Sequence, residues 1–204
     1  MSTRVLLIRH AQVDPIGNWL AGRARGIHLN EKGQMQARQL ARKLANVKLQ
    51  AIYSSPLERA QETAHFAASS KGLDVRTCDG LTDVDFGDWT GKTFEALDAL
   101  PEWHAFNEAR SCARIPGGET MLDVMRRMVC AIDSIRNRHE DATIAIFSHC
   151  DPIRAAIVHY AGMTLDSILR ISIDPASISA LDCDSFGGRI LALNIGGESV
   201  DWLN

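Results

Sequence analysis

The apolar residues of this chain recur in short continuous runs, separated by longer segments with helical periodicity. Residues 5–8, 51–53 and 143–147 are uninterrupted apolar or near-apolar runs. Runs of this length are typical of strands buried on both faces of an α/β sheet. Shorter or weaker strand candidates are residues 75–77, 168–173, 177–181 and 189–194.

Helical periodicity follows each strong run. Asn30 fits the N-cap of one helix, and residues 57–70 form a second helix that Gly72 would end. Asp151 and Pro152 fit the N-cap and first position of another helix. A further amphipathic stripe is formed by Leu122, Met125, Val129 and Ile132.

This alternation predicts one α/β domain spanning residues 1–204, without repeats or linkers. Residues 81–118 depart from it, with a helical patch near residues 94–106 and a Pro-Gly-Gly turn at 116–118. We interpret this region as a small insertion that forms a lid or a substrate wall.

The amino-acid composition indicates which kinds of molecule the protein binds. Hydrophobic residues make up 46% and charged residues 23% of the 204 residues, as in ordinary globular domains. The net charge of −3 gives no general basic field, so nucleic acid is not expected as a partner. The first apolar run is too short for a secretory signal or a membrane span.

The cysteines point to a reducing compartment. There are five of them, scattered and without a CxxC pair or a Cys/His cluster. A disulfide framework or a structural zinc site is therefore not expected, and the cytoplasm is the predicted location.

Polar side chains follow the three strongest strands at the points where they end. His10 follows the first, Ser54 and Ser55 close the second, and His149 follows the third. Ligands of open parallel sheets bind outside the carboxyl ends of the strands, so the two histidines are expected to meet in one cleft.

Arginines near these positions indicate an anion site. Arg9 adjoins His10, Arg59 lies on the first turn after the second strand, and Arg23 and Arg25 follow the first strand. Guanidinium groups match phosphate oxygens, and a neutral imidazole can attack phosphorus to form a phosphohistidine. Because these side chains supply positive charge themselves, no metal or other cofactor is expected.

Five sequence blocks in order resemble the histidine phosphatase superfamily (phosphoglycerate-mutase-like, branch 1). They are residues 7–12 (LIRHAQ), 54–64 (SSPLERAQETA), 81–91 (LTDVDFGDWTG), 116–120 (PGGET) and 147–149 (FSH). The resemblance implies a three-layer α/β/α sandwich with a mostly parallel central sheet and helices on both faces. It also implies a histidine acid phosphatase-type phosphoric monoester hydrolase.

The resemblance also assigns roles to residues. It makes His10 the covalent nucleophile, and it places Arg9, Arg59 and His149 around the phosphate. A carboxylic acid of the third block protonates the leaving group, which makes Asp83 the acid. Glutamate is commoner there, and aspartate reaches roughly 1.5 Å less far. Asp85, two residues on, is the alternative.

Other positions depart from the family pattern. Arg23 matches the Gly-Arg pair of the loop that helps to bind phosphate, whereas Asn18 is shifted by one position from the family's asparagine. Both are retained as candidate phosphate ligands. Ala11 and Cys150 stand where glycine is common, and Cys150 would place a thiol near the phosphate.

The predicted function is hydrolysis of small phosphorylated metabolites through a phosphohistidine on His10, by a monomer or homodimer without a membrane partner. A phosphoglycerate mutase is the enzymatic alternative, although mutases of the family generally carry a longer insertion before the Gly-Gly-Glu block. A catalytically silent phosphate-binding regulatory domain is the alternative from another class, because fold alone does not fix function.

Overall fold

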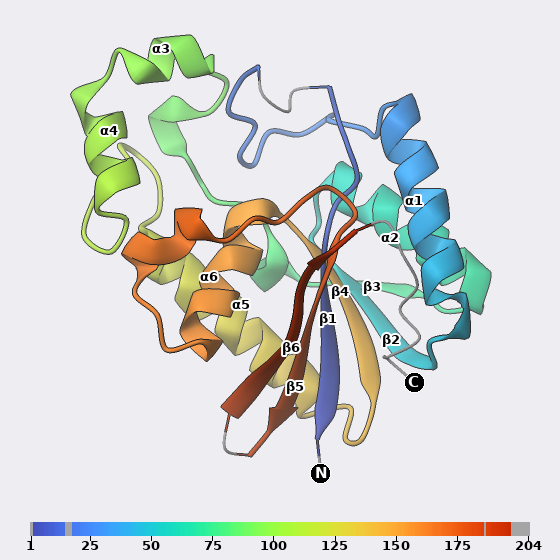
Figure 1. The fold of residues 1–204 in the computed structure, drawn as a ribbon. Coiled ribbons are helices and arrows are strands. Elements are labelled where there is room, and N and C mark those ends of the chain that lie inside the picture. The colour runs from blue at the N-terminus through green and yellow to red at the C-terminus, as the bar shows by residue number, and fades with distance from the viewer. Residues whose placement is uncertain (1, 15–17, 186, 197–204) are drawn as a thin grey trace.

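A computed structural model describes residues 2–14, 18–185 and 187–196, and its central feature is a six-stranded sheet (Figure 1). The strand order is β3-β2-β4-β1-β5-β6. The first four strands run parallel, whereas β5 is antiparallel to β1, and β6 is antiparallel to β5. The strands are β1 (Thr3–Arg9), β2 (Leu49–Ser54), β3 (Val75–Thr77), β4 (Thr143–Ser148), β5 (Ile178–Asp184) and β6 (Gly187–Ile195).

Helices cover both faces of the sheet, so the expected three-layer sandwich is confirmed. One face packs against α1 (Glu31–Lys43) and α2 (Glu58–Lys71), and the other against α5 (Met121–Arg136) and α6 (Cys150–Tyr160) (Figure 1). Alternate side chains of a strand point to opposite faces. Accordingly, Leu6 and Ile8 lie in the cluster with α1 and α2, and Val5 and Leu7 lie in the cluster with α5 and α6.

The signals at the ends of helices act as the sequence predicts in α1 and α2. The Asn30 side chain accepts a 2.8 Å hydrogen bond from the Gly33 amide and caps α1. Gly72 adopts the left-handed conformation at φ 63°, which ends α2 at little steric cost.

Three details differ from the prediction. In α5 the buried residues are Met121, Val124, Met128, Ala131, Ile132 and Ile135. Ile132 is thus buried as predicted, whereas the earlier part of the stripe is shifted by one position. Leu122 is exposed because Thr120 forms a capping box with Asp123, which sets the phase of the helix. The next helix, α6, begins at Cys150 rather than after Asp151. Residues 168–170 of the expected strand at 168–173 belong to the 3-10 helix η4 (Leu165–Arg170), and residues 171–173 form no strand.

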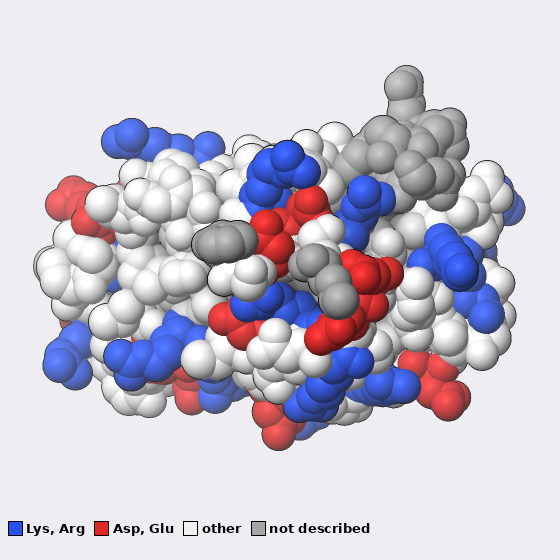
Figure 2. Space-filling view, turned by 90° about the horizontal axis from the view of Figure 1, so that it is seen from below, with Lys and Arg blue, Asp and Glu red and all other residues white. Residues whose placement is uncertain are grey.

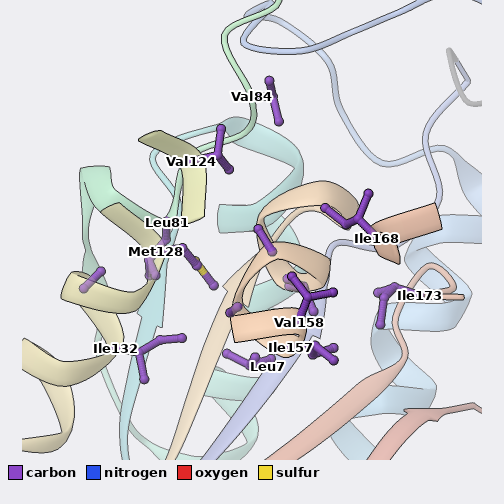
Figure 3. Packing of buried hydrophobic residues seen from close by; sticks show 14 of the residues in the cluster. Leu7, Leu81, Val84, Val124, Met128, Ile132, Ile157, Val158, Ile168 and Ile173 are labelled. Carbon is purple, nitrogen blue, oxygen red and sulfur yellow. The ribbon is translucent and has the colours of Figure 1, made fainter. Parts of the chain in front are cut away.

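The core anchors the loop that carries the candidate acid. Leu81 and Val84, on either side of Asp83, are fully buried and belong to the same apolar cluster as Val124 and Met128 of α5 (Figure 3). Burying two large apolar side chains stabilises this segment by about 2 kcal/mol each. The acid loop is therefore a fixed part of the structure.

The segment between residues 81 and 118 contains the 3-10 helix η3 (Gly87–Trp89) and two short helices, α3 (Phe94–Asp98) and α4 (Pro101–Glu108), beyond the end of the sheet (Figure 1). Trp89 packs against Trp103 and Phe106, with ring centroids 5.4 Å apart in both pairs. These aromatic residues join the main core cluster, which holds the small helices against the sheet domain.

The remaining short elements are the 3-10 helices η1 (Leu44–Asn46) and η2 (Asp79–Leu81). At the end of the molecule where the N-terminus lies, basic and acidic side chains are interspersed (Figure 2). Among the residues that the structure describes, we find no helix with the length and apolarity needed to cross a membrane.

Candidate active site

A cavity of about 330 Å³ opens beyond the carboxyl end of β1 and brings together residues from distant parts of the chain. One end is formed by Arg9, His10, Arg59 and Asp83. An apolar wall contains Val13, Trp19, Leu20, Ala21, Gly22, Phe86, Phe94 and Trp103. The other lining residues are Cys150, which contacts the same Ile173 carbonyl as Arg9, and a cluster of Arg110, Asp151 and Arg154 that is termed the far end.

The register of two neighbouring strands brings the histidines together. Arg9 of β1 pairs with Ser148 of β4, so the residue that follows each strand lies beside the other. The rings of His10 and His149 have centroids 5.2 Å apart. The convergence that was expected from strand ends alone is thus present in the structure.

His10 is held in one tautomer. Its Nδ1 lies 2.7 Å from the carbonyl oxygen of Ala11, which can only accept, so Nδ1 must carry the hydrogen. The lone pair is therefore on Nε2. Burial, together with His149, Arg59 and Arg9, lowers the pKa of His10 well below 6.5, and the ring is neutral at pH 7. A neutral ring with a free Nε2 lone pair is what nucleophilic attack requires.

His149 is fully buried and lies outside the residues that line the cavity. Its Nε2 is 2.8 Å from the Ser55 hydroxyl, and its Nδ1 is 3.5 Å from Asp83 Oδ2. Burial and the charges of Arg59, Arg127 and Arg9 lower its pKa well below 6.5. Because Ser55 accepts a hydrogen bond from the Leu57 amide, its own hydroxyl hydrogen can be donated to Nε2. That arrangement leaves Nδ1 as a donor toward the cavity end.

Arg59 is the most buried cation of the site, with 1% of its side chain exposed. It donates to the Gly22 carbonyl at 2.6 Å and to Asp83 Oδ2 at 3.0 Å. Thr63, one turn along α2, accepts from the Ala11 amide and thereby ties α2 to the end of β1. Arg9 donates to the Ile173 carbonyl at 2.6 Å. Both guanidinium groups are thus oriented by backbone carbonyls and keep further donors for an anion.

Of the two candidate acids, Asp83 is the one on the cavity wall. Its Oδ2 contacts Arg59, and its Oδ1 accepts from the Val84 amide at 2.9 Å. The Asp85 carboxylate instead accepts from the Gly87 amide at 3.0 Å and lies 3.5 Å from Arg23. Asp85 is outside the residues that line the cavity, so the geometry favours Asp83.

Arg23 and Asn18 lie outside the set that lines the cavity. Arg23 donates to the Asp83 carbonyl at 3.0 Å and to Glu119 at 2.9 Å. The Asn18 side chain is exposed and donates to the Asp14 carbonyl at 3.3 Å. As phosphate ligands both residues stay predictions.

A partly buried ion-pair cluster holds the backbone of the acid loop. Arg127 of α5 donates to the carbonyls of Thr82 and Asp83 at 2.7 and 2.9 Å. Glu119 accepts from Arg127 at 2.7 Å and from the Asp85 amide at 2.9 Å. Sequence reasoning missed Arg127, although its place one helical turn after Asp123 on a helix that packs on the sheet was a usable signal.

The far end of the cavity was also missed. Arg110, Asp151 and Arg154 line it, and none of the five sequence blocks includes any of them. Trp19 and Trp103 line the apolar wall, and only Trp89 among the three central tryptophans lies outside the residues that line the cavity.

Cys150 lines the cavity with an unreactive, protonated thiol. Its Sγ lies 3.7 Å from the Ile173 carbonyl, and burial followed by the charge of Asp151 raises its pKa to about 11. The side chain is therefore protonated at neutral pH and is a poor nucleophile.

Comparison with known proteins agrees with this geometry. The model of the histidine phosphatase superfamily (branch 1) matches residues 5–196. Phosphoserine phosphatase 1 of Hydrogenobacter thermophilus is 32% identical over 199 residues, covering 94% of this chain and 92% of that protein. The 2,3-bisphosphoglycerate-dependent phosphoglycerate mutase of Thermoplasma acidophilum is 32% identical over 190 residues, covering 92% of this chain and 90% of that protein. The structure of a mycobacterial glucosyl-3-phosphoglycerate phosphatase superimposes with a TM-score of 0.87 at 25% identity, covering 96% and 100% of the two chains.

Proposed function

The chain belongs to the histidine phosphatase superfamily, branch 1, and on this basis we propose that it is a phosphomonoesterase acting on small phosphorylated metabolites through a phosphohistidine on His10. The observation that carries the proposal is the state of His10. Its Nδ1 is bound to the Ala11 carbonyl and its pKa is lowered by burial and by His149, so Nε2 is a free base on the cavity wall.

The phosphate is held by Arg9, Arg59 and His149. In the structure Asp83 Oδ2 contacts Arg59 at 3.0 Å and lies 3.5 Å from His149 Nδ1. These are the donors that a phosphoryl oxygen needs, so the substrate takes over contacts that Asp83 now makes. The equatorial oxygens then face two guanidinium groups and an imidazole, which stabilises the transition state without a metal.

In the first step, His10 Nε2 forms a bond to phosphorus while the ester P–O bond breaks. The electron pair of that bond goes to the leaving oxygen, which takes a proton from Asp83. In the second step, the Asp83 carboxylate takes a proton from water as the water oxygen attacks phosphorus. The P–N bond breaks, and inorganic phosphate and neutral His10 are released.

Hydrolysis is favoured over the mutase reaction because the insertion is short. Only η3, α3 and α4 lie between the acid loop and the Gly-Gly-Glu block. A mutase has to keep water away from its phosphohistidine, and this small cover leaves a cavity open at the protein surface. Phosphoglycerate mutase activity is the second candidate function, because the chain is similar to the mutase from T. acidophilum.

We place the enzyme in the cytoplasm, as a monomer or homodimer that acts on small molecules and not on nucleic acid or at a membrane. The scattered cysteines support the reducing compartment. The net charge of −3 and the mixed charges on the face opposite the site support the absence of a nucleic acid partner (Figure 2).

The test compares hydrolysis of p-nitrophenyl phosphate by the wild type and by two histidine variants. His10→Ala should lower kcat at least about a thousandfold, because the covalent route is lost. The exposed His65, outside the residues that line the cavity, provides the matched control, and His65→Ala should keep its activity. Turnover that survives in His10→Ala would contradict the mechanism, and a wild type that binds phosphate without turnover would indicate a silent domain.

A further inference from the structure

The far end of the cavity contains a second cationic cluster. Arg110, which follows α4, donates to Asp151 Oδ2 at 2.7 Å, and Arg154 of α6 donates to Asp151 Oδ1 at 3.1 Å. All three side chains line the same cavity as His10. The cluster is therefore positioned to meet the part of a substrate that lies beyond the phosphate.

Arg110 is held there at an energetic cost. Only 5% of it is exposed, and its guanidinium lies 4.3 Å from the centre of the Phe106 ring. Its Nε is buried without a hydrogen-bond partner among residues 2–14, 18–185 and 187–196. Burial of a guanidinium with an unsatisfied donor is unfavourable, which favours a role in binding over a role in stability.

The charges at this end do not balance. Two guanidinium groups face one carboxylate, and both oxygens of Asp151 are occupied by them. The two arginines lower the pKa of Asp151 in spite of its burial, so it stays ionised and the cluster carries one net positive charge. Nη2 of Arg154 has no partner within the described part of the chain and is an available donor.

The orientation of the cluster is fixed by the backbone. Arg154 donates through Nε to the Ile171 carbonyl at 2.6 Å, and Arg9 donates to the Ile173 carbonyl two residues further on. One short segment thus positions an arginine from each of the two groups of charged residues that line the cavity. Such rigid, preoriented guanidinium groups are suited to two separate anionic groups of one ligand.

We propose that Arg110 and Arg154 bind a carboxylate of the substrate, so that the enzyme prefers phosphomonoesters of small hydroxycarboxylic acids. A carboxylate neutralises the surplus charge, whereas a neutral alcohol leaves it unpaired beside an apolar wall. The cavity of about 330 Å³ is at the small end of ligand sites, which fits a compact metabolite. This inference rests on the proposed phosphatase activity.

The test uses two substrates that differ only in the group of interest. 3-Phosphoglycerate carries a carboxylate where glycerol 3-phosphate carries a hydroxymethyl group. The measured quantity is the selectivity ratio, defined as kcat/KM for 3-phosphoglycerate divided by kcat/KM for glycerol 3-phosphate. Where neither ester turns over, the ratio of their inhibition constants against p-nitrophenyl phosphate hydrolysis replaces it.

The wild-type ratio should be about 10 or more, and Arg110→Gln should lower it by about 10- to 100-fold, the range expected for a charged hydrogen bond. Arg154→Lys keeps the positive charge but loses the planar guanidinium that can make two parallel hydrogen bonds. The selectivity ratio should therefore fall by a smaller factor, about 3- to 10-fold. Arg114→Gln is the matched control, because Arg114 is exposed and does not line the cavity. The control should leave the ratio unchanged.

A wild-type ratio near one, or equal losses for both substrates in Arg110→Gln, would overturn the subsite while p-nitrophenyl phosphate hydrolysis still supports the phosphatase. Absence of hydrolysis of p-nitrophenyl phosphate would instead count against the proposed function itself. Thermal unfolding checks that each variant is folded, and if Arg110→Gln is not, Arg154→Lys decides the question.

Discussion

The two ends of the cavity handle charge in opposite ways. At the catalytic end burial lowers the pKa of His10 and of His149, so both rings are neutral. At the far end Arg110 and Arg154 keep Asp151 ionised although it too is buried. A neutral nucleophile serves bond formation, whereas fixed charges serve recognition. Under the proposed function, this difference separates the residues that set the rate from those that select the substrate.

Among variants that keep the nucleophile His10, the largest effect is expected at Arg59. Arg59→Gln removes a buried guanidinium that contacts the acid and is placed to bind phosphate, so kcat/KM should fall by about a thousandfold for every phosphomonoester alike, as for the loss of a preorganised transition-state donor. Steady-state kinetics on 3-phosphoglycerate and glycerol 3-phosphate check this. If kcat/KM fell only for 3-phosphoglycerate, Arg59 would act on the carboxylate rather than on the phosphate, and the two ends would not have separate roles.

The neutral histidines also predict a pH-dependent stability. Their pKa values are lowered in the folded state, so the unfolded chain binds more protons below pH 6.5 and stability falls as the pH drops. Between pH 7.5 and 5.5 the free energy of unfolding should therefore fall, by up to about 1.4 kcal/mol for each ring. Asp151 adds nothing in this window, because its stabilisation is lost only below its ordinary pKa of 3.8.

Urea unfolding at the two pH values measures this loss. His149→Asn keeps one of the two titrating rings and should lose about half as much over the same interval. A wild type whose stability is equal at both pH values would show that the histidines are not held neutral.

A somewhat smaller effect is expected at the acid. Asp83→Asn should lower kcat for alkyl phosphates by about a hundredfold and for p-nitrophenyl phosphate by less than about tenfold, because a good leaving group needs little proton donation. Asp85→Asn is the control with the same chemical change. Equal slowing of both substrate types by Asp83→Asn would assign the proton to another group.

The smallest effect is expected behind the acid loop. Glu119 accepts from Arg23, Arg127 and the Asp85 amide, and so it positions Asp83 without touching the cavity. Glu119→Gln should lower kcat about fivefold and leave KM nearly unchanged, as for a residue that orients an acid used in the transition state. An increase in KM without a change in kcat would instead indicate a direct role in substrate binding.

The contrast between the two ends also explains what the sequence revealed. His10 and His149 each follow a strongly apolar strand, and parallel strands place such positions at one edge of a sheet. Their convergence was therefore predictable from local patterns. Arg110 and Asp151 come together only because the segment after α4 folds back onto the start of α6, which no local pattern encodes.

Helix phase shows the same limit on a smaller scale. The stripe through Leu122 fits the periodicity of α5 as well as the stripe through Met121 does. The capping box between Thr120 and Asp123 and the packing on the sheet select the second. Contacts with the rest of the molecule likewise decide that residues 165–170 form η4 rather than the start of a strand.

The central claim is a covalent phosphohistidine on His10, and trapping that intermediate tests it most directly. The wild type is mixed with radiolabelled 3-phosphoglycerate or p-nitrophenyl phosphate, quenched within milliseconds at a pH that preserves phosphohistidine, and digested for peptide mapping. We predict label on the peptide that contains His10. Label is also expected on this peptide in Asp83→Asn when the substrate is p-nitrophenyl phosphate, because its good leaving group needs little proton donation. Label on His149, or turnover without any labelled histidine, would contradict the account.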